Sequence, residues 1–203
     1  MDESRRERKK RQTRRLIAET AIRLFGERGY EQTTVAQIAQ SADVATKTFF
    51  NYFPAKEDVL FTDFPRRTEV ALQAVADRRS GEGVADVLTR LYDAMLADFR
   101  AEGVGGHDPR VMQVYTDLVM TVPALQAKAL HLAQDLQRVI AAALQDAFPE
   151  ELDAIDAAAV VGAMVGAIQG AALASMERGD PEQALWEAMR RGLAIGLRST
   201  GDR

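Results

Sequence analysis

Residues 33–56, TTVAQIAQSADVATKTFFNYFPAK, constrain the fold of this chain more than any other stretch. Thr34 is a favourable N-cap for a helix that begins at Val35, because its hydroxyl can accept a hydrogen bond from a free backbone N–H. Apolar residues then recur at helical spacing as far as Ala42. Asp43 follows, where the chain has to turn, and aspartate tolerates a left-handed backbone better than most residues other than glycine.

A second short helix is predicted over residues 46–53, and Pro54 ends it. Two short helices joined by a tight turn are typical of the helix-turn-helix, whose second helix enters the major groove of DNA. An apolar stripe predicts a supporting helix over about residues 14–28, and Gly29 is placed to end that helix. Together these segments indicate a DNA-binding unit built from three helices.

The net charge of −4 hides an asymmetry along the chain. Residues 1–56 contain 12 Lys and Arg against 7 Asp and Glu, whereas residues 57–203 contain 14 against 23. A basic N-terminal quarter on an acidic remainder points to a nucleic-acid surface at the N-terminal end. Residues 1–15 alone have eight basic side chains. We expect their first part to be a disordered arm that lies along phosphates or reaches into a minor groove, with a solubilising tail as the alternative.

The chain has no cysteine, which excludes disulfides, zinc–thiolate sites and cysteine nucleophiles. Its two histidines, His107 and His131, are too few and too scattered to indicate a metal site. No Gly-rich phosphate motif and no recognisable catalytic set occur in the sequence. We therefore expect no metal, no cofactor and no enzymatic activity. The charged N-terminus lacks the apolar stretch of a signal peptide, so the expected compartment is the cytoplasm.

The segment AIRLFGERGYEQTTVAQIAQSADVATKTFFNYFPAKEDVL resembles the DNA-binding region of the TetR family of bacterial transcriptional regulators. The resemblance covers roughly residues 14–60 and rests on these residues, which fall in register: Leu24, Phe25, Gly29, Tyr30, Thr33, Thr34, Val35, Ile38, Ala39, Ala42, Val44, Thr48, Tyr52, Phe53 and Lys56. Three positions depart from the family pattern. Asp43 stands in the turn where Gly is usual, Ala45 stands at an N-cap where Ser is frequent, and Phe50 replaces a usual Tyr.

The resemblance and the side-chain chemistry together predict the DNA contacts. Asn51 can pair with adenine, Lys47 can donate to guanine, and Phe50 can contact a thymine methyl group. Hydroxyl and ammonium groups near helix N-termini suit phosphates instead. The predicted DNA-binding residues are Thr34, Thr46, Lys47, Thr48, Phe50, Asn51, Tyr52 and Lys56. Phe49 and Phe53 are expected in the core.

Beyond residue 56 the pattern is helical, with no strand signal. Helices are predicted over residues 56–78 (kinked or divided at Pro65), 84–101, 110–122, 124–147 and 157–176, and from residue 180 onward. The sequence therefore predicts an all-α chain of about nine helices. Residues 1–56 would form the basic arm and a helix-turn-helix DNA-binding domain, and residues 57–203 a helical domain for effector binding and dimerisation.

Residues 157–176, AAAVVGAMVGAIQGAALASM, are long and apolar enough to span a membrane. The run is mostly Ala and Gly and lacks flanking basic residues and aromatic belts, which favours a helix that packs closely against another helix. In the TetR family the last two long helices of each subunit form the dimer interface. The resemblance implies such an interface here, with an intramolecular core as the alternative, and its candidates are Gly162, Gly166, Gly170, Trp186, Met189 and Leu193.

TetR-like proteins usually have a ligand cavity in the helical body, and the resemblance implies one in this chain. The candidate lining residues are Met95, Phe99, Met112, Tyr115, Val119, Met120, Met164, Ile168 and Gln169. They describe an apolar pocket with few polar anchors. We expect a homodimeric repressor that a hydrophobic small-molecule effector releases from a palindromic, double-stranded DNA operator, with no membrane partner. The alternatives are a DNA-binding protein without an effector, an activator, and an all-helical enzyme.

Overall fold

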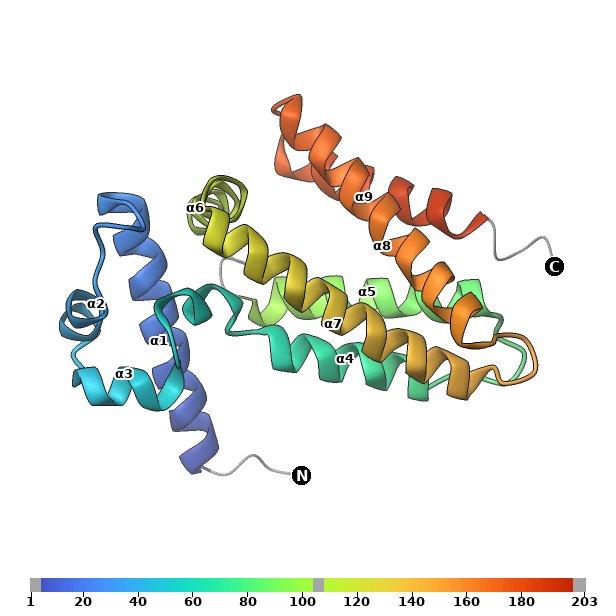
Figure 1. Cartoon of the computed structure of the whole chain (residues 1–203), viewed down its shortest axis with the longest axis horizontal. Coiled ribbons are helices and arrows are strands. Elements are labelled where there is room, and N and C mark those ends of the chain that lie inside the picture. The colour runs from blue at the N-terminus through green and yellow to red at the C-terminus, as the bar shows by residue number, and fades with distance from the viewer. Residues whose placement is uncertain (1–4, 104–107, 199–203) are drawn as a thin grey trace. The chain divides into compact units, whose positions relative to one another are not determined.

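The computed structural model describes residues 5–103 and 108–198, and these residues form helices, turns and loops without any strand. Figure 1 shows the helices in chain order. They are α1 (Arg5–Arg28), α2 (Val35–Ser41), α3 (Thr46–Tyr52), the short 3₁₀ helix η1 (Lys56–Phe61), α4 (Phe64–Ala76), α5 (Val84–Glu102), α6 (Pro109–Thr121), α7 (Pro123–Ala147), α8 (Ala154–Glu177) and α9 (Glu182–Gly196). The predicted all-α fold of about nine helices is confirmed for the described part of the chain.

The N-terminal helix is longer than predicted. It begins at Arg5 instead of near residue 14, so the expected disordered arm is helical over residues 5–13. Arg, Lys, Gln and Glu have high intrinsic helix propensity. Because the C-terminal half of α1 is held by packing, adding turns at its N-terminal end does not require a new nucleus. Residues 1–4 of the predicted arm, like His107, lie outside the described residues.

The single helix predicted over residues 56–78 is two elements. The 3₁₀ helix η1 ends at Phe61, and α4 begins at Phe64. Pro65 therefore lies in the first turn of α4, where its missing N–H has no helical partner to lose, instead of kinking a longer helix. The carboxylate of Asp58 accepts a hydrogen bond from the Ala55 N–H at 2.8 Å, which caps η1.

The chain packs into two compact units. The first, here called the head unit, contains residues 1–67 and 97–132, and the second, the body unit, contains residues 68–96 and 133–203. Helices α4, α5 and α7 contribute residues to both units. The predicted division after residue 56 concerns function and stays a prediction, whereas these two units follow packing.

The head unit has an aromatic core beneath its three N-terminal helices. The side chains of Phe49 and Phe53 are fully buried, as predicted, and their rings lie 5.5 Å apart. Phe25 of α1 completes the group and contacts Tyr30, with ring centroids 5.1 Å apart. Leu118 and Leu125, from α6 and the start of α7, belong to the same core. The positions of α2 and α3 are thus held by buried apolar contacts.

In the body unit, α8 and α9 lie side by side (Figure 1). A Cβ added to Gly192 of α9 would be 2.5 Å from the Ala167 carbonyl oxygen of α8, and one added to Gly196 would be 2.9 Å from the Ala163 oxygen. No larger residue fits at these two positions without moving a backbone. The rest of the body core comes from α4, α5 and α7 and includes Ala71, Val75, Val87, Leu88, Leu91, Ile140, Leu144 and Phe148.

Candidate DNA-binding face

Helix α2 has the N-terminal cap that the sequence predicts. The Thr34 hydroxyl accepts a hydrogen bond from the Gln37 N–H at 3.2 Å, and the Gln37 side chain accepts one from the Thr34 N–H at 2.8 Å. This reciprocal pair is a capping box, which satisfies two backbone donors at the start of the helix. Thr34 remains exposed, so it can still meet a phosphate at this helix end.

The turn between α2 and α3 depends on the backbone of Asp43. Its φ of +52° is the only positive value among the described non-glycine residues. The departure from glycine at this position is therefore accommodated in the left-handed conformation that aspartate tolerates. The Val44 N–H then donates to the Ala39 carbonyl at 2.9 Å, which closes the turn and sets the direction of α3.

Helix α3 presents a polar arc opposite its buried aromatic face. Thr46, Lys47, Phe50 and Asn51 are exposed, and Phe50 has 52% of its surface accessible despite being aromatic. At the start of the helix Ala45 makes no side-chain capping hydrogen bond. The first backbone N–H groups of α3 consequently lack the cap that α2 has. A seven-residue helix with an open polar arc is the right size and chemistry for the major groove.

Lys56 is held inside the protein more than the sequence suggests. Its ammonium donates to the carbonyl oxygens of Tyr30 and Thr33, at 2.8 and 3.1 Å, and lies 3.9 Å from the centroid of the Tyr30 ring. Burial, together with the nearby Glu57 and Glu31 carboxylates, raises the pKa of Tyr30 to about 12, so the phenol is neutral at physiological pH. Lys56 therefore ties η1 to the loop before α2, and a phosphate contact by Lys56 stays a prediction.

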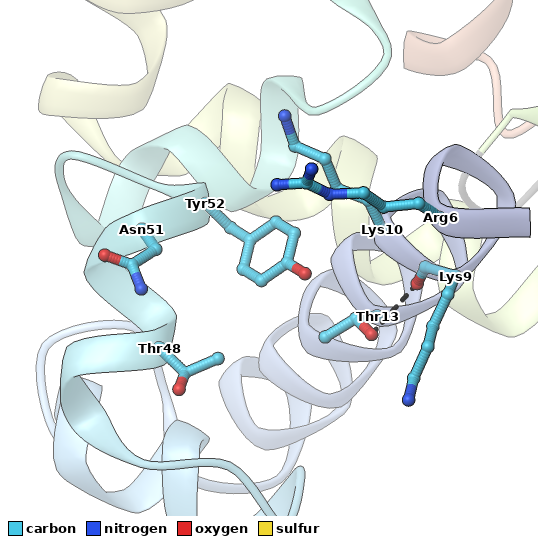
Figure 2. A pocket seen from close by; sticks show the side chains of 7 residues that line it. All are labelled: Arg6, Lys9, Lys10, Thr13, Thr48, Asn51 and Tyr52. Atoms are coloured by element: carbon cyan, nitrogen blue, oxygen red, sulfur yellow. Dashed lines mark hydrogen bonds between the residues drawn. The ribbon is translucent and has the colours of Figure 1, made fainter. Parts of the chain in front are cut away.

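An open cleft of about 380 Å³ separates α3 from the N-terminal half of α1. Figure 2 shows the seven side chains that line it, namely Arg6, Lys9, Lys10, Thr13, Thr48, Asn51 and Tyr52. The structure thus brings three of the predicted DNA-binding residues together with a basic wall that the list of predicted contacts does not contain. The spacing i, i+3, i+4, i+7 of the four α1 residues is a detectable helical signal, but it has meaning only once this segment is helical.

The predicted ligand-pocket residues belong to different units. Phe99, Met112, Tyr115, Val119 and Met120 are in the head unit, whereas Met95, Met164, Ile168 and Gln169 are in the body unit. Tyr115 and Val119 pack against the head core, and burial raises the pKa of Tyr115. Met164 is buried in the body core, while Met120 and Gln169 are exposed. A shared effector pocket stays a prediction.

The predicted interface residues also differ in their surroundings. A Cβ added to Gly162, Gly166 or Gly170 would meet nothing within 4 Å, so this line of α8 is open. Leu193, by contrast, is 4% exposed and packs in the body core. It leaves little surface for another chain, and we assign it to the core instead of an interface. Met189 packs partly on that core, and the Trp186 indole donates to Glu182 at 3.0 Å.

Comparison with known proteins identifies the head unit. Residues 17–62 match the family described as bacterial regulatory proteins, tetR family. The chain is 34% identical over 141 residues to the HTH-type transcriptional regulator TcmR of Streptomyces glaucescens, covering 68% of this chain and 62% of that protein. It is 36% identical over 84 residues to the HTH-type transcriptional regulator HbdR of Aromatoleum sp., covering 41% and 36%. The chain thus spans less than two thirds of the length of either relative.

The fold has the same support from solved structures. The Thermus thermophilus FadR, a TetR family transcriptional repressor solved in complex with lauroyl-CoA, aligns with a TM-score of 0.56 and 21% identity. That alignment covers 94% of this chain and 96% of the FadR chain. It extends the similarity beyond residues 17–62 to the arrangement of the later helices.

Proposed function

Because residues 17–62 place the chain in the TetR family of bacterial transcriptional regulators, we propose that it is a cytoplasmic, homodimeric repressor of transcription. In this proposal the two heads of a dimer bind the two halves of a palindromic operator, and a hydrophobic small molecule releases them. The two recognition helices would read successive major grooves, about 34–36 Å apart.

The observation that carries the DNA-binding role is the arc of Thr46, Lys47, Phe50 and Asn51 on α3. Its members carry the donors, the acceptor and the apolar ring that base edges and thymine methyl groups require. The fully buried Phe49 and Phe53 hold the other side of the helix, so the arc cannot rotate inward. Thr34 and the uncapped start of α3 offer hydroxyl and N–H donors for phosphates beside it.

The surface of α8 supports a second copy of this chain as partner. Only 17% of its most apolar stretch is buried within the chain, although the helix is long and apolar enough to cross a membrane by length and composition. Its open positions recur at helical spacing, with Gly162, Gly166 and Gly170 flanked by Ile155 and Leu173, which are 79% and 41% exposed. Small residues in such a line allow two helix backbones to approach closely. We therefore favour a dimer interface over a membrane span.

The effector is proposed to be a hydrophobic compound bound among the later helices. The FadR neighbour holds lauroyl-CoA, and a short segment of this chain is 39% identical over 51 residues to the fatty acid metabolism regulator protein of Bacillus subtilis. Long-chain acyl-CoA is accordingly the first effector class to test. Burial of Tyr115, which raises its pKa, keeps that hydroxyl neutral and suited to a hydrogen bond rather than an ion pair with a ligand.

The experiment that tests this function begins with selection of DNA from a random duplex library by the purified protein. A palindromic site, bound by a dimer in a gel-shift assay at moderate salt, is the expected result, and no selected site would overturn the regulator function. Lauroyl-CoA, free fatty acids and flat aromatic compounds are then added to the complex. Release by none of them would favour a DNA-binding protein without a hydrophobic effector. Increased transcription from a promoter carrying the site would identify an activator instead.

A further inference from the structure

We propose that the cleft between the N-terminal half of α1 and helix α3 binds the sugar–phosphate backbone of DNA, so that α1 is a second DNA-contacting helix of each head. This inference rests on the proposed function, since it assigns a further part of the same DNA surface. None of the cleft residues on α1 belongs to the set predicted from the helix-turn-helix, which ends its contacts at α3 and Lys56.

The first argument is the helical register of α1. Arg6, Lys9, Lys10 and Thr13 follow the spacing i, i+3, i+4, i+7 and therefore share one face of the helix. The same face continues into the core, because Ile17 and Leu24 are almost completely buried against the head. Packing of the later turns thus fixes the direction in which the basic turns point. A disordered arm would have no such preferred face.

The second argument is the chemistry of the two walls. The α1 wall supplies three exposed cationic side chains, and no described residue forms an ion pair with Arg6, Lys9 or Lys10. The α3 wall supplies the hydroxyls of Thr48 and Tyr52 and the amide of Asn51. None of the seven lining side chains is acidic. Cations opposite hydroxyl and amide donors are the groups that bind phosphate oxygens and sugars in protein–DNA complexes.

The third argument is the position of the cleft beside the reading arc. Asn51 belongs to both, since it is exposed on the arc and also lines the cleft. In Figure 2 the Tyr52 ring points from α3 toward α1, and the Arg6 and Lys10 side chains extend from α1 toward α3. When α3 lies in a major groove, a DNA strand bordering that groove passes next to the helix. The cleft is on one flank of α3, where such a strand has to run.

The assignment explains why an exposed, strongly basic segment remains helical in this protein. Like charges at i, i+4 positions repel one another and weaken a helix, and Arg6 and Lys10 form such a pair. Bound phosphates would remove this repulsion. We therefore expect the free protein to fray at residues 5–12 and the DNA complex to protect their amides from hydrogen exchange.

The decisive experiment compares two triple variants of the full chain. Arg6→Ala/Lys9→Ala/Lys10→Ala removes the cationic wall, whereas Arg5→Ala/Arg8→Ala/Arg11→Ala removes the same charge from the other side of the same turns. Both add three alanines to exposed helix positions, which favours helix formation. Binding is measured by fluorescence anisotropy on a duplex that the wild-type protein selects from random DNA, over a series of salt concentrations.

For the cleft variant we expect at least a tenfold loss of affinity and a salt dependence shallower by about one to three units per head, at roughly 0.9 units per phosphate contact. The loss should be similar on the selected site and on a mismatched duplex, because backbone contacts carry no sequence information. Tyr52→Phe, which removes one hydroxyl from the other wall, should weaken both duplexes about two- to tenfold. The control variant should keep the wild-type salt dependence.

Equal effects of the two triple variants would overturn the proposal, since α1 would then act only as diffuse positive charge. So would wild-type affinity for the cleft variant. Failure of the wild-type protein to select any DNA would instead contradict the proposed function itself. Unchanged far-ultraviolet circular dichroism and unfolding midpoints are required of both variants, and hydrogen exchange over residues 5–12 gives an independent reading.

Discussion

Two surfaces of this protein are prepared for a partner, and they differ in almost every physical respect. The cleft between α1 and α3 is lined by Arg6, Lys9 and Lys10 facing hydroxyl and amide groups. The open line of α8 is made of Gly162, Gly166 and Gly170, with apolar side chains at its ends. One surface offers charge at the ends of long side chains, and the other offers a bare helix backbone.

The difference teaches how each partner would be recognised. Long basic side chains can adjust to a polyanion, and their attraction acts over a distance that salt shortens. A glycine line has no side chain to adjust, so it selects by shape, and burial of apolar surface is insensitive to moderate salt. The same protein would therefore hold DNA by a salt-sensitive contact and hold its second copy by a salt-insensitive one.

Salt titration gives the largest expected contrast between the two surfaces. Raising salt from about 50 to 200 mM should lower operator affinity by roughly 10³ or more, if a dimer makes at least six phosphate contacts. The dimer itself should survive the same change, because its interface is proposed to be apolar. Anisotropy and analytical ultracentrifugation on the same samples measure the two equilibria. Dissociation of the dimer at the higher salt would show that α8 is not its main contact.

Blocking the α8 line should give the next largest effect. Gly166→Arg places a long side chain where even a Cβ meets nothing within 4 Å, so the single chain should still fold. Two such chains could not pack closely, and loss of bivalent binding typically costs about 10²-fold or more in affinity. Light scattering should report a monomer. Ala127→Arg, which adds the same charge at an exposed position of α7, should leave the dimer and its DNA affinity intact.

Lys56 tests which basic residues belong to the DNA surface and which belong to the fold. Lys56→Ala removes two charge-assisted hydrogen bonds to backbone carbonyls and a contact with the Tyr30 ring. We expect a loss of about 2 kcal/mol in the free energy of unfolding, measured by urea denaturation. The exposed Lys47→Ala should change that free energy by less than about 0.5 kcal/mol and alter the preferred base sequence instead. Equal stability of the two variants would assign Lys56 to the surface.

The caps of α2 and α3 give the smallest predicted effect. Thr34→Ala removes the hydroxyl that accepts the Gln37 N–H and should cost about 1 kcal/mol. Ala45→Ser supplies a cap that α3 lacks and should add a similar amount. Thermal unfolding of both variants measures the pair. No gain from Ala45→Ser would mean that the first N–H groups of α3 are already satisfied by water at no cost.

Local signals in the head were strong enough to predict its elements from sequence. Thr34, Asp43 and Pro54 mark helix boundaries through hydrogen bonding and backbone sterics within a few residues, and the structure places the boundaries there. The start of α1 could not be predicted in this way. Its basic turns have no apolar periodicity, and they are helical because the later turns of the same helix are packed.

The site was predictable in part for the same reason. The exposed arc of α3 follows from its helical register and from the burial of Phe49 and Phe53. The internal role of Lys56 does not follow, since the Tyr30 and Thr33 carbonyls that it binds lie more than 20 residues earlier in the chain. Leu193 was assigned to an interface because an apolar helix face gives no sign of whether its partner is the same chain or another.

The sequence by itself determined an all-helical chain, a helix-turn-helix with a left-handed residue at Asp43, and the polar residues that α3 exposes. These features depend on propensity, spacing and capping, which act over one or two helical turns. Only the tertiary structure decided that Arg6, Lys9 and Lys10 face α3 across a cleft, and that the glycines of α8 are open while those of α9 are closely packed. Such facts depend on which helices meet, and distant parts of the chain settle that by packing.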